Sequence, residues 1–491
     1  MKILIFTFET YDALITSCRR CSMLIHVVSA GETLWQIANH YAVPVQSISL
    51  LNALATPDQL AIGQSLVIPS PYTIYTVQSG DTLWSIAQRF SVPLQSIISE
   101  NHLTNPDMLT PGTKLIIPPI IHIVQPGETL WQIAQRYGTT VQVIVVENQI
   151  NNPNMLYVGT NLIIPRELPM IEVNAYSYQP SEEAIDSINA VGHLLTYFSP
   201  FAYKMKEDGT LQPISDESMI AAAKAKNIIP MLTLANFTAT EEGSNLAHVV
   251  LSDADLRKKV MNNVLQVMQD KGYQVLNIDF ENVLPADREN FNAFIQLAAD
   301  MLHPKGYLVS TALAPKTSAT QTGTLYEAHD YEAHGRIADF VVLMTYEWGY
   351  RLGPPQAISP INEMRRVVEY ALTEIPADKI LLGFELYARD WLLPHVKGQE
   401  AETFSPQEAL NRAIKYGATI QFDPTAQSPF YQYVDEQGRH HEVWFEDARS
   451  AQAKFDMVKH YNLRGISYWA LGFPFPQNWV LLSNHFSIKK P

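Results

Sequence analysis

The sequence predicts an α/β protein in which three small β-α-α-β units precede a (β/α)8 barrel that carries a small α+β insertion. The motif G-[DE]-T-L-W occurs three times in the first third of the chain, with its tryptophans 49 and 47 residues apart, which indicates repeated units. From about residue 168, apolar strands alternate with amphipathic helices, as in parallel β/α architecture. The chain has 491 residues, of which 47% are hydrophobic, enough for several domains with their own cores.

Composition excludes several classes of function. The formal net charge of −15 argues against nucleic acid as a partner and against charge-driven binding to anionic surfaces. No run of about 20 apolar residues occurs, so no membrane span is expected. We expect residues 1–23 to be an N-terminal extension, of which residues 1–22 are non-functional and come from an upstream start codon. Their apolar opening is too short for a clear signal peptide, and Cys18 and Cys21 have no second ligand pair for zinc.

Each repeat is predicted to fold as strand, helix, helix and strand. An apolar strand precedes the motif, and an amphipathic stretch, an asparagine and a closing strand that ends in Ile-Pro follow it. The asparagines are Asn52, Asn101 and Asn148, and the prolines are Pro69, Pro118 and Pro165. The predicted units are residues 24–69, 74–118 and 121–165.

These recurring features resemble LysM modules, which bind glycans that contain N-acetylglucosamine. The resemblance implies that the sugar lies between the loop after the first strand and the loop before the last. The implied residues are Gly31, Thr33 and Leu60 in the first unit, Gly80, Asp81, Thr82, Met108 and Leu109 in the second, and Gly127, Thr129 and Leu156 in the third.

A structural role is the alternative for several residues of these units. The glycines could serve turns and the threonines could cap helices. We expect Trp35, Trp84 and Trp131 to pack the small cores rather than to touch sugar. Residues 24–165 contain seven acidic and three basic side chains, so glycan binding would depend on hydrogen bonds and apolar contacts rather than on charge.

The barrel is predicted over residues 169–491. Its eight strands are Ile171–Tyr176, Leu194–Phe198, Ile228–Leu234, Val275–Phe280, Leu308–Ala312, Phe340–Thr345, Ile380–Phe384 and Gly465–Trp469. Helical stretches such as Asp287–Met301 and Ile361–Ala371 lie between them. An insertion, Trp391–Asp447, separates the last two strands and contains hairpin-like runs at Thr419–Phe422 and Tyr431–Trp444. Eight such units fit a (β/α)8 barrel, whereas no glycine-rich phosphate loop supports the alternative, an open doubly wound sheet.

The fourth strand, Val275–Phe280, is mostly apolar, as expected of a strand buried on both faces. Side chains alternate along a strand, so Asn277, Asp279 and Glu281 share one face and the intervening apolar residues share the other. Two carboxylates at i and i+2 hold their pKa values apart, which keeps one protonated near neutral pH. A solvated pair at a strand end is the alternative, but catalytic groups of β/α barrels lie at the C-terminal ends of strands.

The segment Leu276-Asn-Ile-Asp-Phe-Glu281 resembles the fourth-strand signature D-x-x-D-x-D-x-E of glycoside hydrolase family 18, in its N-I-D-F-E variant. More closely, it resembles the spore-cortex-lytic N-acetylglucosaminidases of spore-forming bacteria. The resemblance implies that Glu281 donates a proton to the glycosidic oxygen and that Asp279 orients the acetamido N–H of the substrate. Met344-Thr-Tyr-Glu-Trp348 resembles M-x-Y-[DE], whose tyrosine, here Tyr346, bonds the acetamido carbonyl.

Two later segments extend the same resemblance. Leu386-Tyr-Ala-Arg-Asp390 resembles L-Y-[GA]-R, which places Tyr387 and Arg389 along the cleft; a structural ion pair is the alternative for Arg389. Trp469 at strand eight is expected to form the floor of the pocket. Asn277 and Glu347 stand where many family members have aspartate. The other aromatic candidates near strand ends are Phe198, Trp348 and Trp391.

The resemblance implies retaining hydrolysis of β-1,4 bonds after N-acetylglucosamine in peptidoglycan, assisted by the 2-acetamido group of the substrate. The expected substrate is spore-cortex fragments during germination, and the expected location is the coat and cortex region of the spore or the cell wall. No cofactor and no metal is implied. A chitinase that acts on chitin oligomers and a non-catalytic glycan-binding coat protein are the alternatives.

Overall fold

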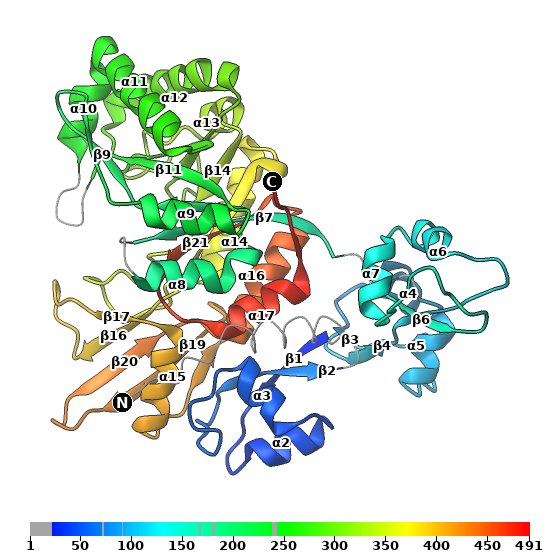
Figure 1. Cartoon of the computed structure of the whole chain (residues 1–491). Coiled ribbons are helices and arrows are strands. Elements are labelled where there is room, and N and C mark those ends of the chain that lie inside the picture. Colours follow the sequence, from blue (N-terminus) through cyan, green and yellow to red (C-terminus); the bar gives the residue numbers. More distant parts are fainter. Residues whose placement is uncertain (1–21, 71–72, 91, 166–167, 179–181, 238–242) are drawn as a thin grey trace. The chain divides into compact units, whose positions relative to one another are not determined.

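The structure, a computed structural model, describes residues 22–70, 73–90, 92–165, 168–178, 182–237 and 243–491 (Figure 1). Cys18, Cys21 and nearly all of the expected N-terminal extension lie outside these residues. The chain divides into two compact units, one formed mainly by residues up to Pro169 and the other mainly by residues from Met170 onward.

The first unit contains three modules with the predicted order of strand, helix, helix and strand. The elements of the first module are β1 (Ser22–Val27), α2 (Leu34–His40), α3 (Val45–Leu51) and β2 (Ser65–Ser70). Those of the second are β3 (Thr73–Thr76), α4 (Leu83–Arg89), α5 (Leu94–Glu100) and β4 (Lys114–Ile117), and those of the third are β5 (Ile120–Ile123), α6 (Leu130–Arg136), α7 (Val141–Glu147) and β6 (Asn161–Ile164). In every module the first and last strands pair antiparallel.

The asparagine in the middle of each module joins the second helix to the last strand. Asn52 Nδ2 donates to the carbonyl oxygens of Ile48 (2.8 Å) and Val67 (2.7 Å), and Val67 N donates to Asn52 Oδ1 (2.7 Å). Asn101 and Asn148 make the equivalent bonds in their own modules. One side chain thus satisfies backbone groups of the helix end and of the strand.

The expectation that the repeated tryptophans pack the module cores is wrong. Trp35, Trp84 and Trp131 are 66%, 66% and 62% exposed. In each first helix the buried positions are the leucine just before the tryptophan and the isoleucine and alanine that follow it. Because successive helical residues point roughly 100° apart, the residue next to the buried leucine turns to the surface.

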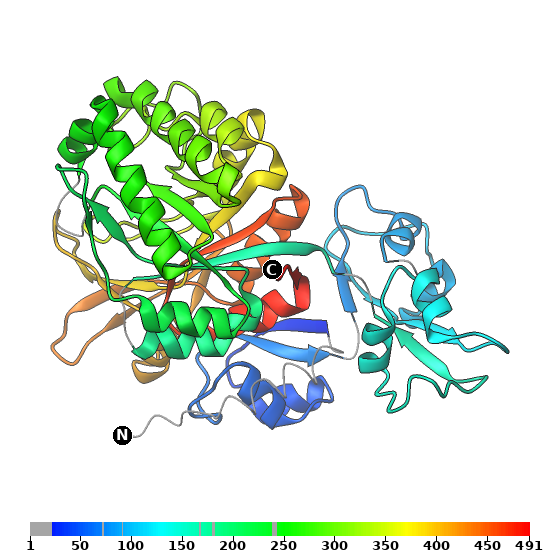
Figure 2. The same ribbon diagram turned by 45° about the horizontal axis from the view of Figure 1, so that its top comes forward.

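The second unit is a closed barrel of eight parallel strands, as predicted (Figures 1 and 2). The strands are β7 (Met170–Ser177), β8 (Tyr197–Pro200), β11 (Ile229–Ala235), β12 (Val275–Asp279), β13 (Leu308–Leu313), β14 (Phe340–Leu343), β15 (Ile380–Glu385) and β21 (Gly465–Leu471). Each strand pairs in parallel with the next, and β21 pairs with β7. Most predicted strand ends lie within one or two residues of the observed ones; β14 ends at Leu343 rather than Thr345, and the largest difference is at β8, which begins three residues late because Leu194 lies in a short 3-10 helix.

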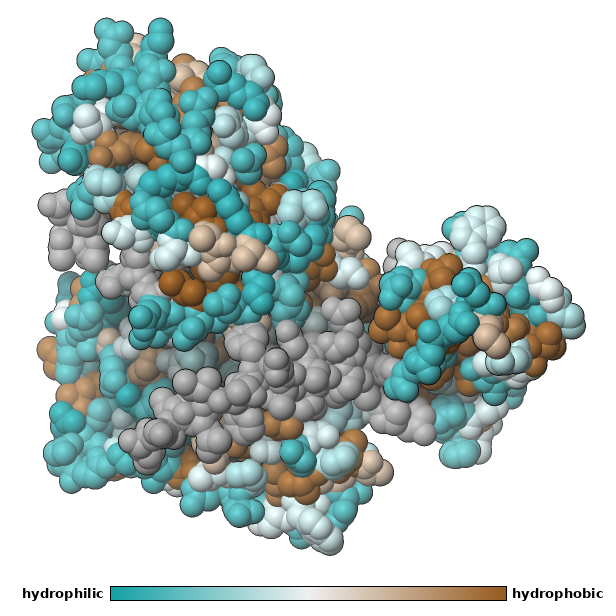
Figure 3. Space-filling model, in the orientation of Figure 1, coloured by the Kyte–Doolittle hydropathy of each residue, from teal (hydrophilic) through white to brown (hydrophobic). Residues whose placement is uncertain are grey.

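Helices follow most strands and cover the outside of the barrel. They are α8 (Glu182–Val191), α9 (Glu217–Ala225), α10 (Ser244–Ser252), α11 (Ala254–Lys271), α12 (Arg288–Leu302), α13 (Tyr331–Ile337), α14 (Ile361–Glu374), α16 (Ala448–His460) and α17 (Pro476–His485). The outward faces of α11 and α12 are mainly hydrophilic in Figure 3. Short strands β9 (Tyr203–Met205) and β10 (Leu211–Gln212) pair beside β11, and β22 (Ser487–Ile488) pairs with β7.

One face of β12 packs against a helix, and the other face carries polar side chains inside the barrel. Phe280, just after the strand, is fully buried and stacks on Phe291 and Phe294 of α12, with ring centroids 5.5 and 5.4 Å apart. On the opposite face Asn277 is bonded inside the barrel. The alternation predicted for this strand is therefore confirmed.

The predicted insertion is a five-stranded antiparallel sheet with one helix. Its elements are β16 (Ala388–Leu393), β17 (Glu402–Phe404), α15 (Pro406–Lys415), β18 (Gln421–Asp423), β19 (Ser428–Val434) and β20 (His440–Trp444), in the sheet order β17-β16-β20-β19-β18. The sheet begins only three residues after β15 ends. The insertion is therefore attached directly to the C-terminal end of a barrel strand, where sites of this fold lie.

Candidate active site

Asp279 and Glu281 lie at the C-terminal end of β12. Burial raises the pKa of Glu281 from its ordinary 4.5 to about 7, and the negative charge of Glu347 adds to the rise. Burial also raises the pKa of Asp279 well above its ordinary 3.8, with a further contribution from the charge of Glu281. A carboxyl group with such a pKa carries a proton near neutral pH, as a general acid must. The sequence predicted that burial and the neighbouring Asp279 raise this pKa, whereas the charge that contributes beside burial is that of Glu347.

Two side chains from neighbouring segments hold the backbone around Glu281. Asn236, fully buried just after β11, accepts a hydrogen bond from Glu281 N (2.9 Å) and donates one to Glu281 O (2.8 Å). His329 Nε2 lies 3.0 Å from Phe280 O, and His329 Nδ1 accepts a bond from Ala314 N (3.0 Å). Burial lowers the pKa of His329 to about 4, so the ring is neutral and donates from Nε2.

Sequence reasoning missed Asn236 and His329. For Asn236 the available signal was a polar residue directly after a buried strand, the same signal that Asp279 and Glu281 give. His329 lies in the long segment between β13 and α13, where the sequence has no periodic pattern that would place it beside β12.

A hydrogen-bonded layer of the barrel interior lies next to Asp279. Asn277 Nδ2 donates to Tyr176 Oη (3.1 Å), and Ser310 Oγ donates to Asn277 Oδ1 (2.9 Å). Burial raises the pKa of Tyr176 well above 10, and the charge of Asp279 contributes to the rise, so the two groups are near each other. Asp279 Oδ1 is buried and has no hydrogen-bond partner among the residues that the structure describes, which leaves it able to accept a bond from a substrate N–H.

Tyr346 follows β14 and faces the same acidic groups. Burial raises the pKa of Tyr346 well above 10, and nearby tyrosine and carboxyl groups add to the rise, so its hydroxyl remains a hydrogen-bond donor. Gly383 on β15 provides the space for this ring. A Cβ atom at Gly383 would come within 2.2 Å of Leu343 O and 3.0 Å of Tyr346 Cε1.

Glu347 lies beside this group in the left-handed region of backbone conformation, with φ at 70°. That conformation costs a non-glycine residue on the order of 1 kcal/mol, and such strain tends to occur at functional sites. Arg389 holds the carboxylate with two bonds of 2.7 Å, from Nη1 to Oε2 and from Nη2 to Oε1. The hydroxyl of Tyr387 also donates to Oε1. The structure thus brings Tyr387 and Arg389 together on Glu347.

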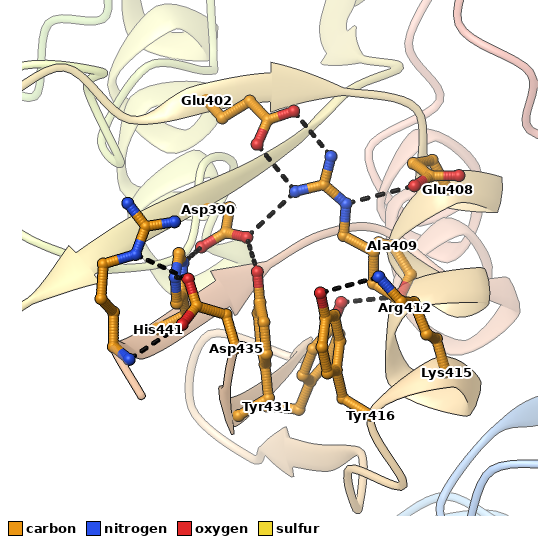
Figure 4. A network of polar contacts seen from close by, with 12 residues as sticks. Asp390, Glu402, Glu408, Ala409, Arg412, Lys415, Tyr416, Tyr431, Asp435 and His441 are labelled. Atoms are coloured by element: carbon orange, nitrogen blue, oxygen red, sulfur yellow. Dashed lines mark hydrogen bonds and ion pairs between the residues drawn. The ribbon is translucent and has the colours of Figure 1, made fainter. Parts of the chain in front are cut away.

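Arg389 comes from β16. The opposite face of this strand bonds to other residues of the insertion (Figure 4). The next residue, Asp390, is buried. Its carboxylate is contacted by Tyr433 Oη (2.6 Å), His441 Nδ1 (2.8 Å) and Arg412 Nη1 (3.1 Å). In Figure 4 the guanidinium group of Arg412 lies between Asp390 and two further carboxylates. Because neighbouring residues of a strand face opposite ways, this network fixes the strand from which Arg389 reaches Glu347.

Trp469, on β21, belongs to an aromatic group at the same end of the barrel. Its ring centroid lies 4.8 Å from that of Phe201, 5.6 Å from Tyr176 and 5.9 Å from Tyr178. Trp469 is half-buried and Tyr178 is 50% exposed, so the group has open aromatic surface. Tyr176 links this surface to Asp279 and Asn277.

Residues 174–473, which contain these side chains, match the family model Glycosyl hydrolases family 18. The chain belongs to glycosyl hydrolase family 18. It is therefore a glycosidase, and the carboxyl, tyrosine and tryptophan groups described above lie in its family 18 barrel. The model LysM domain matches three further segments, residues 26–69, 75–118 and 122–165.

Similar family 18 proteins occur in Bacillus. The cortical fragment-lytic enzyme of Bacillus subtilis (strain 168) is 47% identical over 325 residues, which are 65% of this chain and 75% of that protein. The structure of the spore cortex-lytic enzyme SleL of Bacillus megaterium QM B1551 matches 96% of this chain and 100% of its own, with a TM-score of 0.76 and 37% identity. SleL of Bacillus cereus matches 96% and 99%, with a TM-score of 0.77 and 37% identity.

Two of the aromatic residues expected at the family 18 site are buried rather than exposed in it. Phe198 is fully buried, because Tyr197 takes the position that points into the barrel and Phe198 therefore turns to the helix side. Trp391 is 1% exposed, and its Nε1 donates to Gly353 O (2.8 Å). Neither offers surface to a sugar, so the expectation for these two aromatics is wrong. Trp348 is half-buried.

The candidate sugar residues of the LysM modules have identifiable structural roles. Thr33, Thr82 and Thr129 cap the first helices through capping boxes. Gly31, Gly80 and Gly127 adopt φ of 81°, 87° and 83° in the preceding turn. Leu60, Leu109 and Leu156 are half-buried against the module cores. Asp81 accepts bonds from Tyr75 Oη (2.5 Å) and Gln78 N (2.7 Å), whereas Met108 is 76% exposed.

Among the described residues, no three His, Cys, Asp or Glu side chains are grouped as a metal site. No helix within the described ranges combines the length and the apolar character that crossing a membrane requires.

Proposed function

We propose that this protein hydrolyses the β-1,4 bond after N-acetylglucosamine in spore-cortex peptidoglycan fragments and that its LysM modules hold it on that polymer. The similarity to cortical fragment-lytic enzymes supports the substrate class. The similarity to SleL structures, which extends over 96% of this chain, supports the pairing of modules and barrel in one enzyme. The associated location is the spore or the cell wall.

The observation that carries the proposal is the pair of buried Asp279 and half-buried Glu281, because burial raises the pKa of both carboxyl groups. In the proposed reaction Glu281 gives its proton to the glycosidic oxygen as the bond to the anomeric carbon breaks. The leaving sugar departs as a neutral alcohol. Glu281, now a carboxylate, then removes a proton from the water that completes hydrolysis.

The 2-acetamido oxygen of the substrate acts as the nucleophile, so that no enzyme side chain forms a bond to the sugar. This is the family's exception to the two-carboxylate rule. Asp279 would accept the acetamido N–H and Tyr346 would donate to the acetamido oxygen, which aims that oxygen at the anomeric carbon. Orientation of a tethered nucleophile provides effective molarities on the order of 10⁵ M or more.

The remaining site residues would shape the pocket around the sugar that is cleaved. Trp469 offers an aromatic face. Glu347, held by Tyr387 and Arg389, offers a fixed carboxylate to sugar hydroxyls, and half-buried Trp348 adjoins it. Asn277 positions the polar layer next to Asp279 through Tyr176.

The test compares products from cortex fragments and from chitin oligomers by mass spectrometry. We expect fragments with N-acetylglucosamine at the new reducing end from cortex material already opened by another lytic enzyme, and slow or no cleavage of chitin. Glu281→Gln keeps the shape but cannot donate a proton, so its rate should fall by about 10² to 10⁴, whereas the exposed control Glu289→Gln should keep the rate. Rapid chitin digestion with inert cortex fragments would reject the substrate, and near-normal activity of Glu281→Gln would reject the proton donor.

A further inference from the structure

The exposed tryptophan of each LysM module has no structural role that its surroundings explain. Trp35, Trp84 and Trp131 are the second residues of α2, α4 and α6. Within the part of the chain that the structure describes, no hydrogen bond or ring contact of these indoles is formed. One exposed aromatic residue on a soluble protein is ordinary. Three in the same register need another explanation.

Comparison of the three helices with one another separates core positions from surface positions. The buried positions are identical in all three, with leucine, isoleucine and alanine, because they fill the same small core. The exposed positions otherwise vary: glutamine or serine, asparagine or glutamine, and histidine or arginine. Tryptophan is the one exposed position of these helices that is identical in all three. Packing does not require an exposed indole, so a shared ligand is the simplest cause.

Each tryptophan has an exposed amide one helical turn away. The pairs are Trp35 with Asn39, Trp84 with Gln88 and Trp131 with Gln135. Residues at i and i+4 lie on the same face of a helix. An indole face beside a neutral amide suits a pyranose ring, whose C–H face is apolar and whose edge carries hydroxyl and acetamido groups. The rigid, amphipathic indole supplies contact area with little loss of conformational freedom.

Charge favours a neutral glycan over an anionic surface. Residues 24–165 carry seven acidic and three basic side chains, and binding to anionic lipid would require clustered lysine or arginine. The capping threonine of each helix lies two residues before the tryptophan. The tryptophan face therefore adjoins, along the chain, the loop in which LysM sugar contacts are expected.

We propose that Trp35, Trp84 and Trp131 are sugar-stacking contacts, one in each module, for the pyranose rings of a glycan strand that contains N-acetylglucosamine, with Asn39, Gln88 and Gln135 as hydrogen-bonding partners. This inference rests on the proposed action on peptidoglycan. Three weak contacts on one polymer strengthen one another through effective concentration. Loss of a single indole should therefore weaken retention modestly, and loss of all three should weaken it severely.

The test uses the full chain and sedimentation with insoluble purified peptidoglycan. A single Trp→Gln change should weaken binding about 3-fold and the triple variant about 30-fold, because the free-energy effects of distant substitutions add and their fold-changes therefore multiply. Conversion of all three to tyrosine should retain most of the binding, and the triple amide variant Asn39→Ala, Gln88→Ala, Gln135→Ala should also weaken it. The matched control Ile121→Gln, Ile123→Gln removes two residues that are 55% and 53% exposed elsewhere in a module and should bind like the parent.

Cleavage of a soluble chromogenic N-acetylglucosaminide, which needs no retention, should be unchanged in every variant. Thermal unfolding should also be unchanged, because the substituted side chains are exposed. The inference would be overturned if the triple Trp→Gln variant were retained on peptidoglycan like the parent. It would also be overturned if the variant kept its binding to glycan and lost, relative to the parent, binding to anionic vesicles. If the parent binds peptidoglycan and the variant does not, while neither cleaves cortex fragments, the inference stands and the proposed function fails.

Discussion

The proton on Glu281 leads to a pH dependence whose direction the structure determines. The pKa of Glu281 is about 7, raised from 4.5 by burial and by the charge of Glu347. As the pH rises through about 7, Glu281 loses its proton and with it the capacity to act as the acid. The proposed mechanism therefore predicts that kcat/KM falls on the alkaline side with a midpoint near pH 7, since kcat/KM reports the free enzyme.

The gain in protonated Glu281 follows from comparing its raised pKa with the ordinary value for glutamate. At pH 7 a group with a pKa of about 7 is half protonated, whereas one with a pKa of 4.5 is protonated about 150-fold less often. Part of this gain comes from Glu347. A like charge raises the pKa of a carboxyl group because it disfavours the ionised form, and the bidentate contact of Glu347 with Arg389 reduces that contribution.

Glu347→Gln tests this reasoning directly. The change removes the repelling charge and leaves the Arg389 cation without its carboxylate, and both effects lower the pKa of Glu281. We expect the alkaline midpoint of kcat/KM on soluble cortex fragments to move down by about one pH unit. The control Glu289→Gln removes an exposed carboxylate on α12 and should leave the midpoint unchanged. A midpoint that stays in place or moves up in Glu347→Gln would refute the electrostatic account, whatever happens to the rate at the optimum.

Two further outcomes follow from the site. Asn236→Ala removes both side-chain bonds to the backbone of Glu281, each contributing about 1 kcal/mol, so kcat should fall at least 10-fold with little change in KM. Asn236→Asp should recover part of the rate because it keeps the acceptor for Glu281 N. Equal loss of rate in both variants, with the same drop in melting temperature, would indicate a purely structural role. Attack by the acetamido oxygen followed by water gives two inversions at the anomeric carbon, so NMR during the first turnovers should show the β-anomer, and the α-anomer as first product would exclude substrate assistance.

Regular patterns made much of the fold predictable from the sequence. The three motifs predicted the three modules because buried leucine and isoleucine positions, and the proline that closes each unit, recur in register. The eight parallel strands appeared as apolar runs, and β12 could be oriented because side chains alternate along a strand. Asp279, Glu281 and Tyr346 were predicted as site residues from their positions at or just after strand ends, and the structure brings these three groups to the same end of the barrel.

What escaped prediction depends on the angle of a side chain or on a contact between distant segments. The register at β8 decides that Tyr197 faces the interior and Phe198 the helices, and both residues are apolar, so alternation alone could not assign their faces. The left-handed backbone of Glu347 has no sequence signature, because glycine or asparagine would have marked it and glutamate does not. The contact of His329 with the carbonyl of Phe280 joins positions 49 residues apart.

The insertion influences the pKa of Glu281, the proposed acid, although Glu281 itself lies at the end of β12. The network around Asp390 fixes β16, β16 carries Arg389, and Arg389 holds Glu347 in a backbone conformation that a free loop would leave. Glu347 in turn raises the pKa of Glu281. If Glu347 were mobile, water would screen its charge and Glu281 would ionise at lower pH. The five-stranded sheet of the insertion therefore stabilises the protonated state of Glu281, the proposed acid, through a single strand whose two faces carry Arg389 and Asp390.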